Sequence, residues 1–261
     1  MSAELTQAEK DLYQEQGYLH VKGLLTLEEA AAYRAECHRL AERTGNTDAT
    51  WSSVRSTDEG KRVRLSHCHD VQFYSAAFTR LLVDPRLTRV AQGIIGPNVQ
   101  LHHTKMFIKA PENGSPFPMH QDYPYFPHQK HSMIAVIIHF DDAPVEKGCL
   151  RVVPGSHKLG PLESIGQDHH LPEDRYPIEN ALPLPARAGD AIFMSYLLVH
   201  GSGVNRSQEP RTTVLIQMRD PADVQLNDRH SSRGQGMMLA GIDPRESKFE
   251  FAWERESAAG R

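Results

Sequence analysis

The sequence places a histidine and a carboxylate two positions apart in the segment Met119-His120-Gln121-Asp122. Residues i and i+2 of an extended strand point to the same face of that strand. His120 and Asp122 could therefore ligate one metal ion, because an imidazole nitrogen and a carboxylate oxygen are both good ligands for iron. The motif is short, however. Taken alone, it is better interpreted as a surface histidine beside a solvated carboxylate.

A second histidine, His200, ends the apolar run Tyr196-Leu197-Leu198-Val199 and leads into a glycine-rich turn. It could be an exposed residue at the rim of a sheet, or a third ligand from a different strand. Two histidines and one carboxylate form a facial triad, which leaves positions on Fe(II) open for a keto acid and for dioxygen. A closed site without open positions would serve a structural role instead.

Arg211 opens a segment of alternating character that ends at Arg219. An apolar face packs against a second layer, so the polar face of this strand should point into a barrel with a ligand cavity. A buried dicarboxylate there needs a planar bidentate donor, which arginine supplies better than lysine. Arg211 could also be a plain surface arginine, and Arg206 is an alternative. We prefer Arg211 because it follows Pro210 and begins the strand.

Two more residues could bind the same anion. Lys105 lies at the centre of an apolar strand, where it shares one face with His103 and Phe107. Lysine is costly to bury unless it is paired, and a cosubstrate carboxylate could be its partner. Ser202 follows His200 by two positions and could add a hydroxyl donor.

The elements that must position these residues fall into two parts. The first hundred residues are predicted to be mainly helical, with capping boxes at Thr6–Glu9 and Thr26–Glu29, an Asp84-Pro85 helix start, and an irregular polar stretch at 45–70. From about residue 99, β-branched and aromatic runs predict strands at 99–110, 131–140, 149–153, 191–199 and 212–219. These strands, without alternating helices, predict an antiparallel sandwich or barrel.

Composition limits the class of protein. The chain has 261 residues and a net charge of -4, which gives no electrostatic case for nucleic acid or an anionic membrane as partner. Its 3 cysteines do not form a disulfide framework. We see no signal peptide and no run near the roughly 20 apolar residues that span a bilayer. We therefore expect a cytoplasmic protein; the sequence does not indicate its oligomeric state.

Four motifs occur in a fixed order: HQDYPYF at 120–126, CLRVVPGSHK at 149–158, HGSG at 200–203, and Pro-Arg at 210–211. This order, together with EQGYLHVKGLL near the N-terminus, resembles the phytanoyl-CoA dioxygenase family of iron(II)/2-oxoglutarate oxygenases over residues 8–220. The resemblance implies a double-stranded β-helix, or jelly roll, flanked by helices. It also implies iron on His120, Asp122 and His200, with Arg211, Ser202 and Lys105 as contacts of the 2-oxoglutarate cosubstrate.

On this interpretation residues 1–261 form one oxygenase domain, with a helical part to about 98, a jelly-roll core to about 220 and a C-terminal extension. We expect hydroxylation of a small organic molecule that uses dioxygen and releases succinate and carbon dioxide. Alternatives are a cupin-like metalloenzyme that does not use 2-oxoglutarate and a non-catalytic jelly-roll binding protein.

Substrate contacts are harder to predict. The candidate pocket residues are Gln121, Tyr123, Phe107 and Phe126, together with the long loop at 155–180, which is either a functional lid or disordered. His157 is expected to shape the start of that loop. Most of the remaining histidines, among the 15 in the chain, are expected to have ordinary surface or hydrogen-bonding roles.

Overall fold

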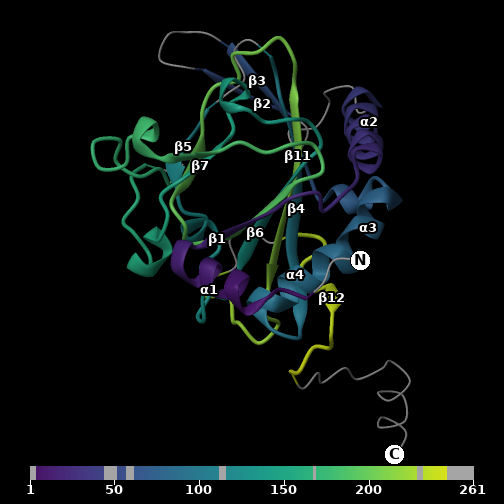
Figure 1. Ribbon diagram of the computed structural model, residues 1–261, viewed down its shortest axis with the longest axis vertical. Helices are drawn as coiled ribbons and strands as arrows, with labels where there is room; N and C mark the ends of the chain where they lie inside the picture. Colours follow the sequence, from purple (N-terminus) through teal and green to yellow (C-terminus); the bar gives the residue numbers. More distant parts are fainter. Residues whose placement is uncertain are drawn as a thin grey trace, which may run out of the picture.

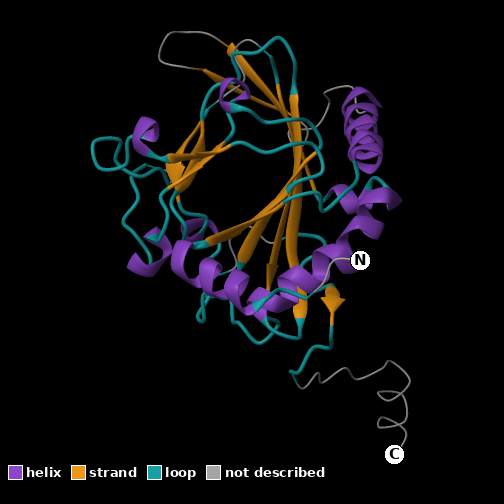
Figure 2. Ribbon diagram, in the orientation of Figure 1, coloured by secondary structure: helices purple, strands orange, loops and turns teal. Residues whose placement is uncertain are grey.

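The computed structural model describes residues 4–43, 52–56, 62–111, 116–166, 169–227 and 232–245. Its described strands form two antiparallel sheets that face each other (Figures 1 and 2). The larger sheet has the order β1-β9-β6-β11-β4-β3-β2, with β12 paired to β4, and the smaller has the order β5-β10-β7-β8. Two facing antiparallel sheets of this kind form the jelly roll that the sequence predicts.

The strands of the larger sheet are β1 Tyr18–Val21, β2 Ser52–Ser56, β3 Arg62–His69, β4 Val99–Lys109, β6 Ile134–His139, β9 Ala191–Ser195, β11 Arg211–Arg219 and β12 Met238–Ala240. Those of the smaller sheet are β5 Phe117–His120, β7 Leu150–Val152, β8 Leu182–Leu184 and β10 His200–Ser202. Short 3-10 turns lie at η1 Val71–Phe73, η2 Tyr123–Tyr125, η3 Val145–Lys147, η4 Ser156–Leu159 and η5 Ile178–Asn180.

Four described α-helices precede β4: α1 Gln7–Gln16, α2 Leu27–Arg43, α3 Ala76–Leu82 and α4 Pro85–Ile95. Their starts follow the sequence signals. Thr6 and Glu9 form a reciprocal capping box at α1, and Thr26 and Glu29 exchange equivalent hydrogen bonds at α2. The Asp84 side chain accepts a hydrogen bond from the Arg86 N–H at the start of α4.

The helices cover the outer face of the larger sheet (Figure 2). The apolar faces of these helices and strands meet in one core, whose members include Leu40, Phe78, Leu87, Met106, Val136, Phe193, Val214 and Ile216. The inner face of β11 carries the opposite set of side chains, and Arg211, Thr213, Leu215 and Gln217 line a cavity between the sheets. The predicted orientation of this strand is therefore confirmed.

Two expectations about the chain's organisation need correction. The first hundred residues contain strands as well as helices, because β1 pairs with β9 and β3 pairs with β4. Part of the stretch at 45–70 that was predicted to be irregular thus extends the larger sheet. In addition, β12 in the C-terminal extension pairs with β4, so that extension is partly integrated into the same sheet.

The long connection after β7 packs against the smaller sheet in its described part. Leu171 and Ala181 join Met119 and Val199 in a small apolar cluster. His157 contacts the carbonyl oxygen of Gln14 across a distance of 3.2 Å, which fits its expected structural role at the start of the loop. In the described part of the chain, no helix is both long and apolar enough to cross a membrane.

Candidate active site

His120, Asp122 and His200 come together between the two sheets. Their potential ligand atoms all lie within 4.8 Å of one another. Asp122 Oδ1 lies 3.6 Å from His120 Nε2 and 3.8 Å from His200 Nε2. The pairing of β5 with β10 sets His120 directly opposite His200, so the smaller sheet brings both imidazoles to one place.

Hydrogen bonds orient each of these side chains toward the shared centre. His120 Nδ1 lies 2.7 Å from the carbonyl oxygen of Pro118, and His200 Nδ1 lies 2.9 Å from that of Leu198. Each Nδ1 therefore carries the proton, which leaves the Nε2 lone pair facing the centre. On Asp122, Oδ2 accepts a hydrogen bond from Gln217 Nε2 at 2.8 Å, which leaves Oδ1 for a metal ion.

Asp122 reaches the centre through a turn, and not through the continuous strand that the sequence predicts. Strand β5 ends at His120, and Asp122 has helical backbone angles of φ -75° and ψ -22° at the start of η2. The Asp122 N–H donates to the carbonyl oxygen of Tyr196 at 2.9 Å, which fixes this turn. A tight turn after His120, rather than a continuous strand, thus places the two side chains together.

The electrostatics of the cluster favour a cation. Burial alone would raise the pKa of the Asp122 carboxyl, but the neighbouring histidines and Gln217 outweigh it and lower the pKa below its usual value. Burial, reinforced by His120, lowers the pKa of His200 to about 4. A charged carboxylate beside neutral imidazoles is the donor set that Fe(II) requires, so these residues fit a facial iron site with open positions.

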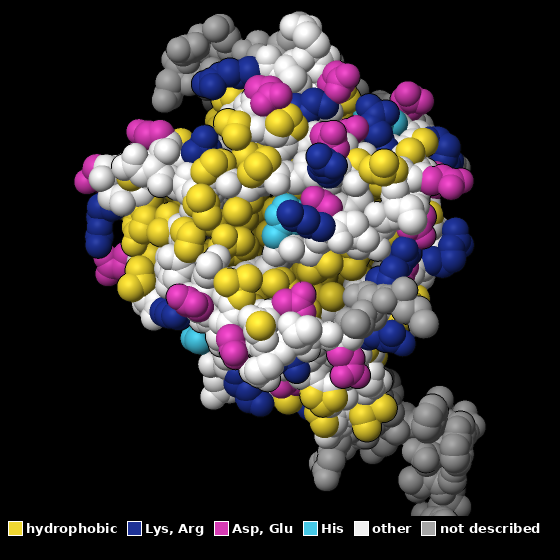
Figure 3. Space-filling model, viewed as in Figure 1, with side chains coloured by type: hydrophobic (Ala, Val, Ile, Leu, Met, Phe, Trp, Pro, Cys, Tyr) yellow, Lys and Arg dark blue, Asp and Glu magenta, His cyan; other side chains and the backbone are white. Residues whose placement is uncertain are grey.

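A cavity of about 620 Å³ begins at this cluster and extends between the sheets. Its described wall combines the metal cluster with aromatic and aliphatic residues, including Phe107, Phe117, Tyr125, Phe126, Ile137, Leu150 and Met194. The face of the molecule seen in Figure 3 is hollowed near its centre, with hydrophobic side chains around the hollow and a histidine at its edge. The volume lies in the range of sites that enclose small ligands.

The far end of the cavity is basic. Arg211 is 7% exposed, lines the cavity and donates from Nη1 to the carbonyl oxygen of Gly148. Gly148 has a φ of 66°, and a side chain there would collide with the Gly203 carbonyl oxygen. Burial lowers the pKa of Arg211 to about 10, so its guanidinium remains charged at neutral pH. Ser202 also lines the cavity, whereas Arg206, the sequence alternative to Arg211, is exposed.

Lys109, which the sequence patterns did not single out, is not among the described lining residues but lies directly behind Arg211 and Ser202, which are. It pairs with Arg211 across β4 and β11, is 0% exposed, and donates from Nζ to Ser202 Oγ at 2.8 Å and to the Gly203 carbonyl oxygen at 2.7 Å. Burial, with a contribution from Arg211, lowers its pKa well below the ordinary value. Alternation along β4 could have identified it, because Lys105, Phe107 and Lys109 share one face.

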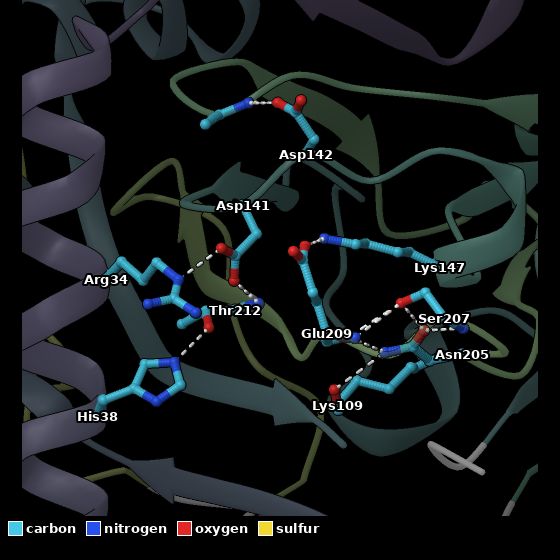
Figure 4. Close-up of polar contacts among 11 residues, drawn as sticks. Arg34, His38, Lys109, Asp141, Asp142, Lys147, Asn205, Ser207, Glu209 and Thr212 are labelled. Atoms are coloured by element: carbon cyan, nitrogen blue, oxygen red, sulfur yellow. Dashed lines mark hydrogen bonds and ion pairs between the residues drawn. The ribbon is translucent and has the colours of Figure 1, made fainter. Parts of the chain in front are cut away.

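A scaffold of polar contacts holds the start of β11 in place (Figure 4). Asp141 accepts from Arg34 of α2 at 2.5 Å and from the Thr212 N–H at 2.8 Å, while His38 contacts the Thr212 hydroxyl at 2.9 Å. Asn205 donates to the Glu209 carbonyl oxygen at 2.8 Å, just before β11 begins. Arg211 therefore projects from a backbone that is fixed on both sides.

The remaining predicted site residues separate into two groups. Lys105, Phe107 and Phe126 line the cavity, as a role in binding requires. Gln121 instead makes structural contacts: Nε2 donates to the Leu197 and Gly160 carbonyl oxygens at 2.6 and 3.0 Å, and Oε1 accepts from Leu162 N–H at 2.9 Å.

Tyr123 packs with its ring against His131 and Tyr196, at ring-centroid distances of 5.5 and 5.7 Å. Neither Gln121 nor Tyr123 is among the described residues that line the cavity. The expectation that these two side chains form the pocket wall is therefore corrected.

Some histidines expected to have ordinary roles also line the cavity. They are His69, His103, His139 and His170. His69 belongs to β3, which the sequence analysis interpreted as irregular, and His170 comes from the long loop. His69 and His170 therefore reach the cavity from segments whose local sequence gives little indication of it, whereas His103 shares the strand face that already carries Lys105 and Phe107.

Comparison with known proteins extends these observations. The family model for phytanoyl-CoA dioxygenase matches residues 13–213. Peroxisomal phytanoyl-CoA dioxygenase of Rattus norvegicus is 28% identical over 232 residues, which covers 80% of this chain and 67% of the relative. Ectoine dioxygenase of Streptomyces avermitilis is 27% identical over 234 residues, which covers 81% of this chain and 78% of the relative.

A solved structure is similar over most of the chain. It is an epimerase, SnoN, crystallised in complex with Fe3+, α-ketoglutarate and nogalamycin RO. The TM-score is 0.70 at 25% sequence identity, and the match covers 91% of this chain and 96% of the epimerase.

Proposed function

Because this chain belongs to the phytanoyl-CoA dioxygenase family and is an Fe(II)- and 2-oxoglutarate-dependent oxygenase, we propose that it hydroxylates an unactivated carbon of a small organic molecule. In this proposal His120, Asp122 and His200 hold the iron, and Arg211 binds the distal carboxylate of 2-oxoglutarate. One observation carries these assignments: the buried metal cluster and the buried arginine line the same cavity.

The reaction balances when one atom of dioxygen enters the hydroxylated substrate and the other enters succinate. Substrate C–H, 2-oxoglutarate and dioxygen give substrate C–OH, succinate and carbon dioxide. When bound, the iron supplies the site at which dioxygen and the keto acid react. The protein orients the reactants and excludes water, which is the main way in which such a cavity accelerates a reaction.

The basic end of the cavity suits a carboxylate. Among the described residues, no acidic side chain lies within ion-pair distance of Arg211 or Lys109. Buried cations without a counter-charge are costly, and the distal carboxylate of the cosubstrate would provide that charge. Ser202 contacts Lys109 and can donate its own hydroxyl proton to the same carboxylate. Lys105 lines the same cavity, and we propose it as a further contact of the cosubstrate.

A small substrate fits the rest of the cavity. Phe107, Tyr125 and Phe126 provide apolar walls near the metal cluster. Relatives include proteins named for ectoine and methylphosphonate, which are small molecules. The sequence has no clear basic patch for the phosphates of a CoA thioester, so we propose a small free metabolite rather than a CoA ester as the substrate.

The proposal is tested by anaerobic visible spectroscopy of the purified protein with Fe(II) and then 2-oxoglutarate. The wild type should develop a metal-to-ligand charge-transfer band, which His200→Ala should lose. Arg211→Ala should need at least about 30-fold more 2-oxoglutarate, since truncating one partner of a buried charge pair costs about 2–5 kcal/mol. Arg206→Ala is the matched control, because that arginine is exposed on the preceding loop and should leave the titration unchanged.

The alternatives predict different spectra. Iron binding without a 2-oxoglutarate band, or equal titrations for Arg211→Ala and Arg206→Ala, would favour a cupin-like enzyme that does not use this cosubstrate. Absence of iron binding in the wild type would favour a non-catalytic binding protein. Circular dichroism of each variant shows whether a lost band reflects a lost fold.

A further inference from the structure

His139 occupies a fixed position at the basic end of the cavity. It is the last residue of β6, is 1% exposed, and lines the cavity together with Ile137. Its backbone N–H donates to the Asp190 carbonyl oxygen at 2.9 Å, and its carbonyl oxygen accepts from Gly189 N–H at 2.8 Å. In register it lies opposite Thr213 of β11, two residues from Arg211.

The imidazole of His139 has unused hydrogen-bonding capacity. Both of its ring nitrogens are buried, and within the described parts of the chain neither has a hydrogen-bond partner. Buried polar side chains almost always have at least one partner, since leaving one unpaired costs free energy. Arg211 Nε is likewise buried and unpartnered among the described residues, although Nη1 of that arginine is bonded to Gly148.

The surroundings keep His139 neutral. Burial lowers its pKa to about 3, and nearby Arg211 and His20 act in the same direction, against a smaller opposing effect of Asp190. A neutral imidazole has one N–H donor and one acceptor nitrogen. The N–H of this neutral imidazole can donate a hydrogen bond to the same anion that Arg211 binds. It needs no acidic side chain of the protein as its acceptor.

We propose that His139 donates a hydrogen bond to the distal carboxylate of 2-oxoglutarate beside Arg211 and thereby helps to select this keto acid. The inference rests on the proposed function. It adds a specificity-determining residue from β6, which pairs with β11 on the side away from β4 and Lys109. Arg211 on β11 would contribute a positive charge, whereas His139 on β6 would contribute a hydrogen bond that fixes the orientation of the carboxylate. Two donors on adjacent strands define where the distal carboxylate must lie, and therefore the length of keto acid that also reaches the iron.

The test compares two ligands on the Fe(II)-loaded protein under anaerobic conditions. 2-Oxoglutarate has the distal carboxylate, whereas 2-oxopentanoate has the same carbon chain and ends in a methyl group. The dissociation constant of each is measured by titration of the charge-transfer band or by calorimetry. Each variant then yields a preference ratio, which is insensitive to partial loss of active protein.

His139→Leu should weaken 2-oxoglutarate binding by roughly 10- to 100-fold, as expected for loss of a hydrogen bond to a charged group. Binding of 2-oxopentanoate should stay unchanged, so the preference ratio falls by the same factor. His139→Gln should retain most of the preference, because its amide can still donate. His128→Leu is the matched control: His128 is 0% exposed, also has an unpartnered ring nitrogen, and is not among the described residues of the cavity wall.

The outcomes separate this inference from the proposed function. If the wild type prefers 2-oxoglutarate and His139→Leu keeps that preference, or loses affinity for both ligands equally, the role of His139 is overturned and the cosubstrate assignment stands. If the wild type does not distinguish the two keto acids, the cosubstrate assignment fails and the role of His139 fails with it.

Discussion

The two oxygens of Asp122 have different surroundings. Oδ1 faces the imidazoles of His120 and His200, while Oδ2 accepts a hydrogen bond from Gln217. Gln217 is 1% exposed and lies on β11, in the opposite sheet from the two histidines. A carboxylate that could rotate would present its oxygens to the metal in several orientations, so the amide of Gln217 fixes one of them.

Replacing Gln217 by leucine should therefore weaken Fe(II) binding by about 10- to 100-fold, the usual effect of losing a hydrogen bond that orients a metal ligand. The dissociation constant is measured by anaerobic Fe(II) titration. Gln100→Leu is the control, because Gln100 is an equally buried glutamine that bonds to the Gly236 carbonyl oxygen away from the cluster. Equal iron affinities for the two variants would contradict a role for Gln217 in orienting Asp122.

Among the elements, α2 has a role that extends beyond covering the sheet. Its Arg34 and His38 meet Asp141 and Thr212 at the beginning of β11 (Figure 4). These contacts fix the backbone at Thr212, immediately after Arg211, whose side chain enters the cavity. A helix on the outer face of the larger sheet thus positions a residue on the inner face.

Asp141→Ala should lower the free energy of unfolding by about 1–3 kcal/mol, because it leaves the Thr212 N–H and Arg34 without their acceptor. It should also raise the dissociation constant of 2-oxoglutarate by shifting Arg211. Urea unfolding and ligand titration measure the two effects. Asp142→Ala is the control, because among the described residues this neighbouring carboxylate accepts from the Ala188 N–H and does not contact Thr212, so 2-oxoglutarate affinity should not change. Unchanged affinity in both variants would show that α2 does not position Arg211.

Local patterns determined which elements could be predicted. The runs at 99–110 and 212–219 became β4 and β11, because alternating β-branched residues suit a strand buried on one face. Strand β10 is short, and its partners β5 and β7 lie far away in the chain. Strand β3 is polar, and it joins the larger sheet through β4, about 40 residues farther along. Their positions depend on tertiary pairing, which local periodicity does not contain.

The same distinction holds within the site. His120 and Asp122 are close in sequence, so their motif indicated a metal site, and Arg211 was recognisable at a strand start. Lys109 and His139 gain their significance from register, since each meets β11 across the sheet near Arg211. The position of Gln121 was misjudged because the turn after β5 points it under the long loop instead of toward the cavity.

At the scale of the whole molecule, the interior contains several buried histidines, whose protonation links the stability of the fold to pH. His139 has its pKa lowered from 6.5 to about 3. The unfolded chain would bind a proton at this position below about pH 6.5, while the folded protein would not. Stability from this histidine is therefore complete above that pH and is lost as the pH falls toward 3.

Between pH 7.5 and pH 5, this linkage should cost the wild type about 2 kcal/mol of unfolding free energy through His139 alone. Urea unfolding of the metal-free protein at both pH values, for wild type and His139→Gln, measures it. The glutamine variant should lose correspondingly less stability over the same interval. An identical pH dependence for the two proteins would show that His139 is not held neutral by the fold.

The placement of the reactive groups on opposite walls has a consequence for how the barrel holds together. His120 and His200 belong to the smaller sheet, whereas Arg211 and Gln217 belong to the larger one. In the proposed arrangement, the smaller sheet would hold the iron through His120 and His200, and the larger sheet would hold 2-oxoglutarate through Arg211. By mass action, a ligand that binds only the folded protein, at about 100 times its dissociation constant, raises the free energy of unfolding by about 2.7 kcal/mol. On this proposal the bound reactants would act as part of the tertiary structure, and cohesion between the sheets would rise and fall with each catalytic cycle.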